Sequence, residues 1–155
     1  MTKLQQSGSI VIARSPEDLY DMVADVTRIG EFSPVCRECW WEGDADGPAV
    51  GAWFIGHNVT ADRDWKTRSE VVVAERGREF AFLLGGAYAR WGYTFAPVGG
   101  GTEVTESWEF LPEGRTFFEA RFGDEAEATI ADRSESARTG IAATLAAIKR
   151  TAEAG

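Results

Sequence analysis

The stretch WGYTFAPVGGGTEVTESWEF, residues 91–110, predicts two strands joined by a tight turn. Three consecutive glycines separate two segments rich in aromatic and β-branched residues, which is typical of an antiparallel hairpin. Successive side chains of a strand point to opposite faces of a sheet. The bulky side chains of the first strand therefore share one face, and these are Trp91, Tyr93 and Phe95. The remaining sequence has to fit this antiparallel framework.

One carboxylate interrupts the apolar face of the second strand. Val104, Glu106, Trp108 and Phe110 point the same way by alternation, and this face is expected to point into a core. Burial raises the pKa of a carboxyl group unless a cation or hydrogen-bond donors offset it. Three interpretations of Glu106 are open: an ion pair with a residue such as Arg138, a hydrated position near a cavity mouth, or a functional group that faces a ligand.

The same kind of pattern recurs along the chain before the hairpin. Six strands are expected, separated by short turns that contain glycine or charged residues, and this spacing indicates an antiparallel sheet. They span residues 36–42, 51–60, 65–75, 78–84, 89–96 and 102–111. An earlier strand, GSIVIARS (8–15), precedes a helix that begins with Ser15 as N-cap and Pro16 at the first position. A short second helix or turn then ends at Pro34.

The C-terminal segment changes to a helical period. From Asp124 to Glu153 there is no proline and alanine is abundant, so one long amphipathic helix is expected, at about residues 124–152. Its apolar stripe consists of Ile130, Ala137, Ile141, Leu145, Ile148 and Ala152. Gly140 lies close to this stripe, where a small residue allows either close packing on the sheet or room for a ligand.

Composition limits the classes of function. The chain has 155 residues, of which 44% are hydrophobic, and we expect one domain over residues 1–155. A net charge of −9 without clustered basic residues argues against a nucleic-acid partner. No apolar run approaches the roughly 20 residues that span a bilayer, and the N-terminus does not resemble a signal peptide. A cytoplasmic protein is expected.

Two cysteines form a C-x-x-C motif, Cys36 and Cys39. Redox motifs of this kind usually open a helix, whereas the residues that follow here predict a strand. Positions i and i+3 of a regular strand face opposite sides about 10 Å apart, which is too far for a disulfide. Two ordinary reduced cysteines are therefore expected. A metal site is not expected either, because the chain has a single histidine, His57.

Five segments in the right order resemble the polyketide cyclase/dehydrase branch of the START-related superfamily, also called SRPBCC. They are SPEDLYDMVADVTRIGEFSP (15–34), GPAVGAWFIGHN (47–58), WKTRSEVVVAERGREFAF (65–82), the 91–110 hairpin and GIAATLAAIKRTAE (140–153). The resemblance implies an α+β helix-grip fold, in which a curved seven-stranded antiparallel sheet surrounds a long C-terminal helix, with two short helices after the first strand. It also implies a cavity between sheet and helix for a hydrophobic or aromatic molecule, with no cofactor and no shared catalytic signature.

Strand phase and the resemblance together select the cavity-facing residues. On bulk alone, Trp53, Ile55 and His57 would point inward, but the resemblance places Phe54, Gly56 and Asn58 on the cavity side. Trp53 and Ile55 would then form an apolar pair on the outer face, which suggests a homodimer contact. The expected ligand-binding set is Trp41, Phe54, Asn58, Trp65, Ser69, Phe80, Phe82, Trp91, Tyr93, Trp108, Ile141 and Leu145.

Three functions fit these residues. The first is a binder or carrier of a hydrophobic small molecule, lipid- or polyketide-like. The second is a polyketide cyclase or dehydratase in which Glu106 is the acid/base and Tyr93, Asn58 or Ser69 donates hydrogen bonds. The third is an interaction module whose cavity is filled by its own side chains. Phosphate loops and a Ser-His-Asp triad are not expected, because no serine lies in the required glycine-flanked turn and no glycine-rich stretch matches the loop pattern.

Overall fold

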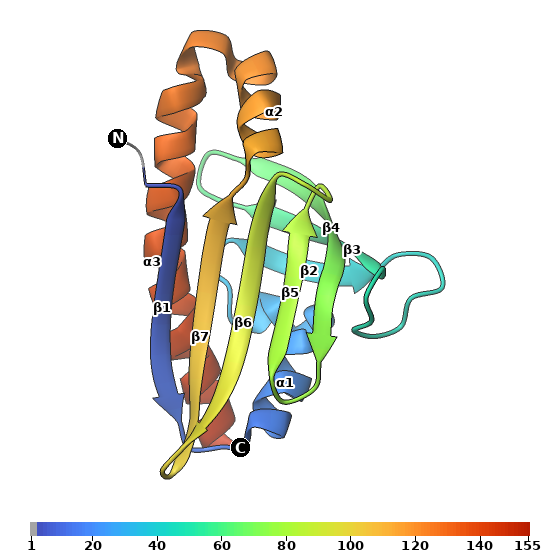
Figure 1. The fold of residues 1–155 in the computed structure, drawn as a ribbon, viewed down its shortest axis with the longest axis vertical. Helices are drawn as coiled ribbons and strands as arrows, with labels where there is room; N and C mark the ends of the chain where they lie inside the picture. Colours follow the sequence, from blue (N-terminus) through green and yellow to red (C-terminus); the bar gives the residue numbers. More distant parts are fainter. Residues whose placement is uncertain (1–2) are drawn as a thin grey trace.

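A seven-stranded antiparallel sheet packs against one long helix in the computed structural model, which describes residues 3–155 (Figure 1). The strands follow the order β1-β7-β6-β5-β4-β3-β2 across the sheet. Their bounds are β1 Gln5–Ile12, β2 Cys36–Trp41, β3 Trp53–Val59, β4 Asp64–Glu75, β5 Glu79–Leu84, β6 Ala89–Val98 and β7 Gly101–Phe110. Each of the six later strands begins and ends within two residues of its predicted bounds, which confirms the antiparallel framework. The first strand, β1, begins and ends three residues earlier than predicted.

Two short helical segments follow β1, as expected: α1, Pro16–Ala24, and η1, Val26–Glu31. The Ser15 hydroxyl accepts a hydrogen bond from the backbone N–H of Asp18 at 3.1 Å, so Ser15 is the predicted N-cap. These two helical segments join the two edges of the sheet, because β1 and β2 lie at opposite edges. Helix α1 contacts β5 and β6, while η1 contacts β2, so this segment covers one end of the sheet's concave side.

The long helix α3, Ala126–Ala154, buries the predicted apolar stripe. All six residues of that stripe are buried, which confirms the helical period. Helix α3 packs mainly on β1 and β7, beside one edge of the sheet (Figure 1). Gly8 of β1 allows this approach, since a Cβ at that position would lie 3.0 Å from the Cγ2 atom of Ile141 and 3.6 Å from the Cδ1 atom of Leu145.

A further helix, α2 (Pro112–Phe122), was not predicted. It has no side-chain N-cap, and its apolar residues do not form a regular stripe, so the sequence signal is weak. Tertiary contacts hold it instead: the ring of Phe117 stacks on Tyr88 with centroids 4.6 Å apart, and Phe118 packs edge-on against Phe110 at 5.2 Å. A short 3-10 turn, η2 (Gly123–Glu125), then leads into α3, which begins two residues after the predicted start.

Two β-bulges break the strict alternation that the sequence analysis assumed. In β4 the register shifts between Val71 and Val73, so Ala74, not Val73, lies opposite Phe80 and packs on the core. In β2 the register shifts between Cys36 and Glu38. The second bulge changes the interpretation of the cysteines, as described below. Among residues 3–155, no helix is long and apolar enough to cross a membrane.

Candidate functional site

The pairing register brings the predicted site residues into adjacent rows on the face of the sheet that α3 partly covers. One row runs across four strands through Phe80, Tyr93, Glu106 and Gly8. Because Gly8 lies directly beneath Ile141 and Leu145 of α3, Glu106 lies next to the contact between helix and sheet. The neighbouring row contains Phe82, Trp91 and Trp108.

Glu106 is buried, with only 3% of its surface exposed. The hydroxyl of Tyr93 donates a hydrogen bond to the Oε2 atom of Glu106 at 2.9 Å. The other carboxyl oxygen, Oε1, is also buried and has no hydrogen-bond partner among the described residues. A polar atom in this condition is rare in folded proteins and calls for a specific explanation.

Two of the three interpretations of Glu106 are wrong in this structure. Arg138 is exposed and pairs with Glu135 of the same helix, so it does not neutralise Glu106. The carboxyl group is also too deeply buried for a hydrated position at a mouth. The interpretation that Glu106 faces a ligand stays a prediction.

Burial raises the pKa of Glu106 to about 8, and the hydrogen bond from Tyr93 offsets this only in part. The pKa of Tyr93 is raised in turn, first by burial and then by the charge of Glu106. At neutral pH the carboxyl group is therefore mostly protonated. The Oε2 atom accepts the hydrogen bond from Tyr93. A proton on the other oxygen, Oε1, makes that oxygen a hydrogen-bond donor for an acceptor next to it.

Aromatic rings lie on the same face of the sheet as this pair. Phe54 packs edge-on against Trp41 and Phe82, with ring centroids 5.7 Å and 5.0 Å apart. Phe54 is buried on the inner face of β3, as the resemblance implied, although bulk alone favoured Trp53 and Ile55. Of the rings predicted to face a ligand, five remain partly exposed after folding: Trp41, Trp65, Phe82, Trp91 and Tyr93.

The other predicted ligand-facing residues are more completely buried. Phe80 is fully buried and packs edge-on against Tyr20 of α1, so it belongs to the packed core at that end of the sheet. The Asn58 side chain donates to the Thr67 hydroxyl at 3.1 Å. The remaining members are buried on the same side, and they are Ser69, Trp108, Ile141 and Leu145.

The prediction that Cys36 and Cys39 face opposite sides of the strand is wrong. The Sγ atoms of Cys36 and Cys39 lie 3.1 Å apart, although both cysteines are free. The bulge between Cys36 and Glu38 brings both side chains to one face, whereas a regular strand would separate them. Both sulfurs lie over Gly56, where a Cβ atom would be 3.3 Å and 3.6 Å from them. Regular strand alternation contains no signal for this bulge.

The outer face carries the residues predicted for a dimer contact. Trp53 and Ile55 lie on it, and each is only partly exposed. The guanidinium of Arg68 lies 3.9 Å from the ring centroid of Trp53 and so covers part of the apolar surface. His57 is on the same face and pairs with the exposed Asp64 at 2.7 Å. Association through Trp53 and Ile55 stays a prediction.

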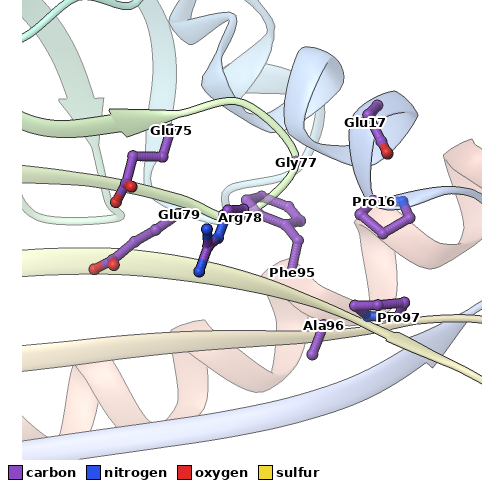
Figure 2. A pocket seen from close by; sticks show the side chains of 9 residues that line it. All are labelled: Pro16, Glu17, Glu75, Gly77, Arg78, Glu79, Phe95, Ala96 and Pro97. Carbon is purple, nitrogen blue, oxygen red and sulfur yellow. The ribbon is translucent and has the colours of Figure 1, made fainter.

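Hollows open on the surface at the β4–β5 turn and near the edge formed by β1 and β7. Figure 2 shows the larger, of about 550 Å³, between the start of α1, the β4–β5 turn and the end of β6. It is lined by Pro16, Glu17, Glu75, Gly77, Arg78, Glu79, Phe95, Ala96 and Pro97, none of which was predicted as a site residue. The smaller, of about 420 Å³, includes Trp108 near the edge formed by β1 and β7. Neither is lined by Glu106 or Tyr93, and residues 3–155 hold no cluster of three metal-ligating side chains.

The sequence matches a family model described as polyketide cyclase / dehydrase and lipid transport over residues 1–153. No curated protein matches it. Among solved structures, it is similar to the "Polyketide_cyc-like" protein Cgl2372 from Corynebacterium glutamicum, with 48% identity and a TM-score of 0.72. That match covers 99% of this chain and 94% of the other.

More distant structures share the fold. The di-domain ARO/CYC protein StfQ from the steffimycin biosynthetic pathway is 15% identical with a TM-score of 0.70, and the match covers 97% of this chain and 51% of StfQ. The protein CV1439 from Chromobacterium violaceum is 15% identical with a TM-score of 0.66, over 97% of this chain and 99% of the other. These similarities confirm the fold that the five sequence segments implied.

Proposed function

Because this chain belongs to the polyketide cyclase/dehydrase and lipid transport family, we propose that it binds one hydrophobic, ring-containing molecule that carries a carbonyl or hydroxyl oxygen. The molecule lies on the concave side of the sheet, between the aromatic rings of the inner face and α3. Its oxygen faces Glu106. Family membership supports hydrophobic binding in general, and the arrangement around Glu106 supports the more specific ligand.

The observation that carries this proposal is the buried Oε1 atom of Glu106, which has no partner among the described residues. An unsatisfied buried polar group costs about 1–3 kcal/mol. A ligand oxygen that accepts a hydrogen bond from the protonated Oε1 removes this penalty. A ligand with such an oxygen therefore gives Oε1 the hydrogen-bond partner that the protein does not supply. A purely hydrocarbon ligand leaves Oε1 without a partner.

The rings on the same face of the sheet as the carboxyl group favour a flat ligand. Trp41, Phe82 and Trp91 are partly exposed on the inner face, so they retain apolar surface that a ligand can cover. Binding sites for small molecules combine such apolar walls with a few placed polar groups. Here the polar groups are the carboxyl group of Glu106 and the hydroxyl of Tyr93, and the hydroxyl oxygen lies 2.9 Å from the Oε2 atom of Glu106.

The test compares two probes that share one ring skeleton, fluorenone and fluorene, of which only the first has a carbonyl oxygen. We expect the wild-type protein to bind fluorenone roughly five- to tenfold more tightly, which corresponds to one hydrogen bond of about 1–1.4 kcal/mol. In Glu106→Leu this preference should disappear, because the donor is gone. Fluorescence or calorimetric titration measures both affinities.

The matched control is Glu103→Leu. Glu103 lies on the same strand but is exposed on the opposite face, so its replacement should leave the preference for fluorenone unchanged. Equal affinities of the two probes for the wild-type protein, or equal effects of the two substitutions, would refute the assignment of Glu106.

A second function, proton transfer in a cyclase or dehydratase, is favoured by the pairing of Glu106 with Tyr93. The pKa of Glu106, about 8, lies near neutral pH, which is the range that suits a general acid or base. Glu106→Gln separates the two functions, since an amide still donates a hydrogen bond but transfers no proton. A binder retains its preference for fluorenone in this variant, whereas a catalyst retains binding and loses turnover of its poly-keto substrate.

A further inference from the structure

The thiols of Cys36 and Cys39 are in contact on the inner face of the sheet. Their sulfur atoms are 3.1 Å apart, and the Cys36 thiol also lies 3.5 Å from the carbonyl oxygen of Glu38. Neither the ligand proposed above nor its hydrogen bonds require this pair. The arrangement is therefore a second group of reactive side chains with a chemistry of its own.

The backbone around the two cysteines suits a disulfide. Cys36 and Cys39 lie opposite Asn58 and Gly56 of β3, because the bulge turns three steps along β2 into two steps along its neighbour. Two steps along a strand amount to about 6.5 Å and return to the same face. This separation falls within the range of roughly 4.4–6.8 Å that disulfides span between their Cα atoms. Oxidation then needs side-chain rotation and little movement of the backbone.

The two thiols differ in environment. Cys36 is partly exposed, and its pKa is lowered chiefly by the hydrogen bond with Cys39, with help from the backbone of Glu38 and His57. Cys39 is buried, and its pKa is raised by the hydrogen bond with Cys36 and by burial. A more acidic, accessible thiol beside a buried one is the usual division between an attacking and a resolving cysteine.

We propose that Cys36 and Cys39 form a redox-active site that a hydroperoxide oxidises to an intrachain disulfide. The Cys36 thiolate attacks one peroxide oxygen, the O–O bond breaks, and Cys36 becomes a sulfenic acid while hydroxide leaves. The sulfur of Cys39 then attacks the sulfur of Cys36 and forms the S–S bond. The sulfenic oxygen leaves as water with the proton of the Cys39 thiol, and the proton released earlier by the Cys36 thiol converts the hydroxide to the second water molecule. Two thiols lose two electrons and two protons, and hydrogen peroxide becomes two water molecules.

A metal-binding role fits the same pair less well. A tetrahedral zinc ion with bonds of about 2.3 Å would hold two thiolate sulfurs about 3.8 Å apart and needs further ligands. The observed separation of 3.1 Å is shorter, and within residues 3–155 no third metal-ligating side chain joins the two cysteines. The contact therefore favours a bond between the sulfurs over a shared ion.

The experiment treats the full chain with a small excess of hydrogen peroxide and follows its intact mass. We expect the monomer to lose two hydrogen atoms, a peptide map to link Cys36 to Cys39, and dithiothreitol to restore the original mass. In Cys39→Ser, Cys36 should instead gain one oxygen and react with dimedone, a sulfenic-acid reagent. In Cys36→Ser, the remaining thiol should stay unmodified under the same conditions, because it is buried.

Several results would overturn the proposal: no loss of hydrogen from the wild-type chain, a disulfide that joins two chains, or oxidation of Cys39 ahead of Cys36. The wild-type measurement needs no variant, so a folding defect in either serine variant does not affect it. It also needs no ligand, so failure here and failure of the proposed binding function are separate outcomes.

Discussion

At the scale of single residues, Glu106 has a buried oxygen atom without a hydrogen-bond partner, and the proposed ligand supplies that partner. Its strand places it among apolar neighbours, and the sequence alone shows this, because strict alternation puts it between Val104 and Trp108. The sequence could not show that Oε1 lacks a partner or that Tyr93 supplies one for Oε2, since both depend on the pairing of β6 with β7. Arg138, the partner that the sequence suggested, pairs instead with its helical neighbour Glu135.

The raised pKa of Glu106 predicts a specific dependence of stability on pH. Between the ordinary value of 4.5 and about 8, the folded protein holds a proton on this group that the unfolded chain has released. The free energy of unfolding therefore falls as pH rises through this window, by about 5 kcal/mol from this group, and changes no further above it. Glu106→Gln lacks this contribution and should gain stability relative to wild type between pH 4.5 and pH 8.5.

Urea unfolding of both proteins at the two pH values measures the change. The comparison between wild type and variant cancels the other titrating groups, including Tyr93, Cys36 and Cys39 near the same face. A difference in stability between the two proteins that is the same at pH 4.5 and pH 8.5 would show that Glu106 ionises normally.

At the scale of elements, the position of α3 depends on one small residue opposite it. Gly8→Val places methyl groups where Ile141 and Leu145 now pack, and overpacking of a core typically costs about 1–3 kcal/mol. We expect a lower urea midpoint for Gly8→Val. The control is Ser7→Val on the exposed face of the same strand, which should change stability by less than about 0.5 kcal/mol. Equal midpoints for the two variants would mean that α3 does not rest on β1 as described.

Elements with a strong period were predictable, and those held by tertiary contact were not. The stripe from Ile130 to Ala152 repeats with helical spacing, and β7 alternates regularly, so both appear directly in the sequence. Helix α2 has neither a cap nor a stripe and depends on the rings of Tyr88 and Phe110. The bulge in β2 moved Cys36 to the same face as Cys39, and regular alternation cannot predict such a shift.

At the scale of the whole molecule, the sheet and α3 form one framework that holds rings, a carboxylic acid and a thiol pair on the same concave side. The sequence identified most of these residues because five segments together resemble one family, and the family model then matched residues 1–153. We propose that residues 1–155 fold as one domain, since the strands adjacent to α3 come from both ends of the chain.

A crystal structure of the protein with fluorenone tests the central claim most directly. We predict that the ring system lies on the concave face against Trp91, with its carbonyl oxygen about 2.5–3.0 Å from the Oε1 atom of Glu106. The hydrogen bond between Tyr93 and Oε2 should remain. If fluorenone instead binds in the surface hollow of Figure 2 and Oε1 still has no partner, the assignment of Glu106 to the ligand site is wrong.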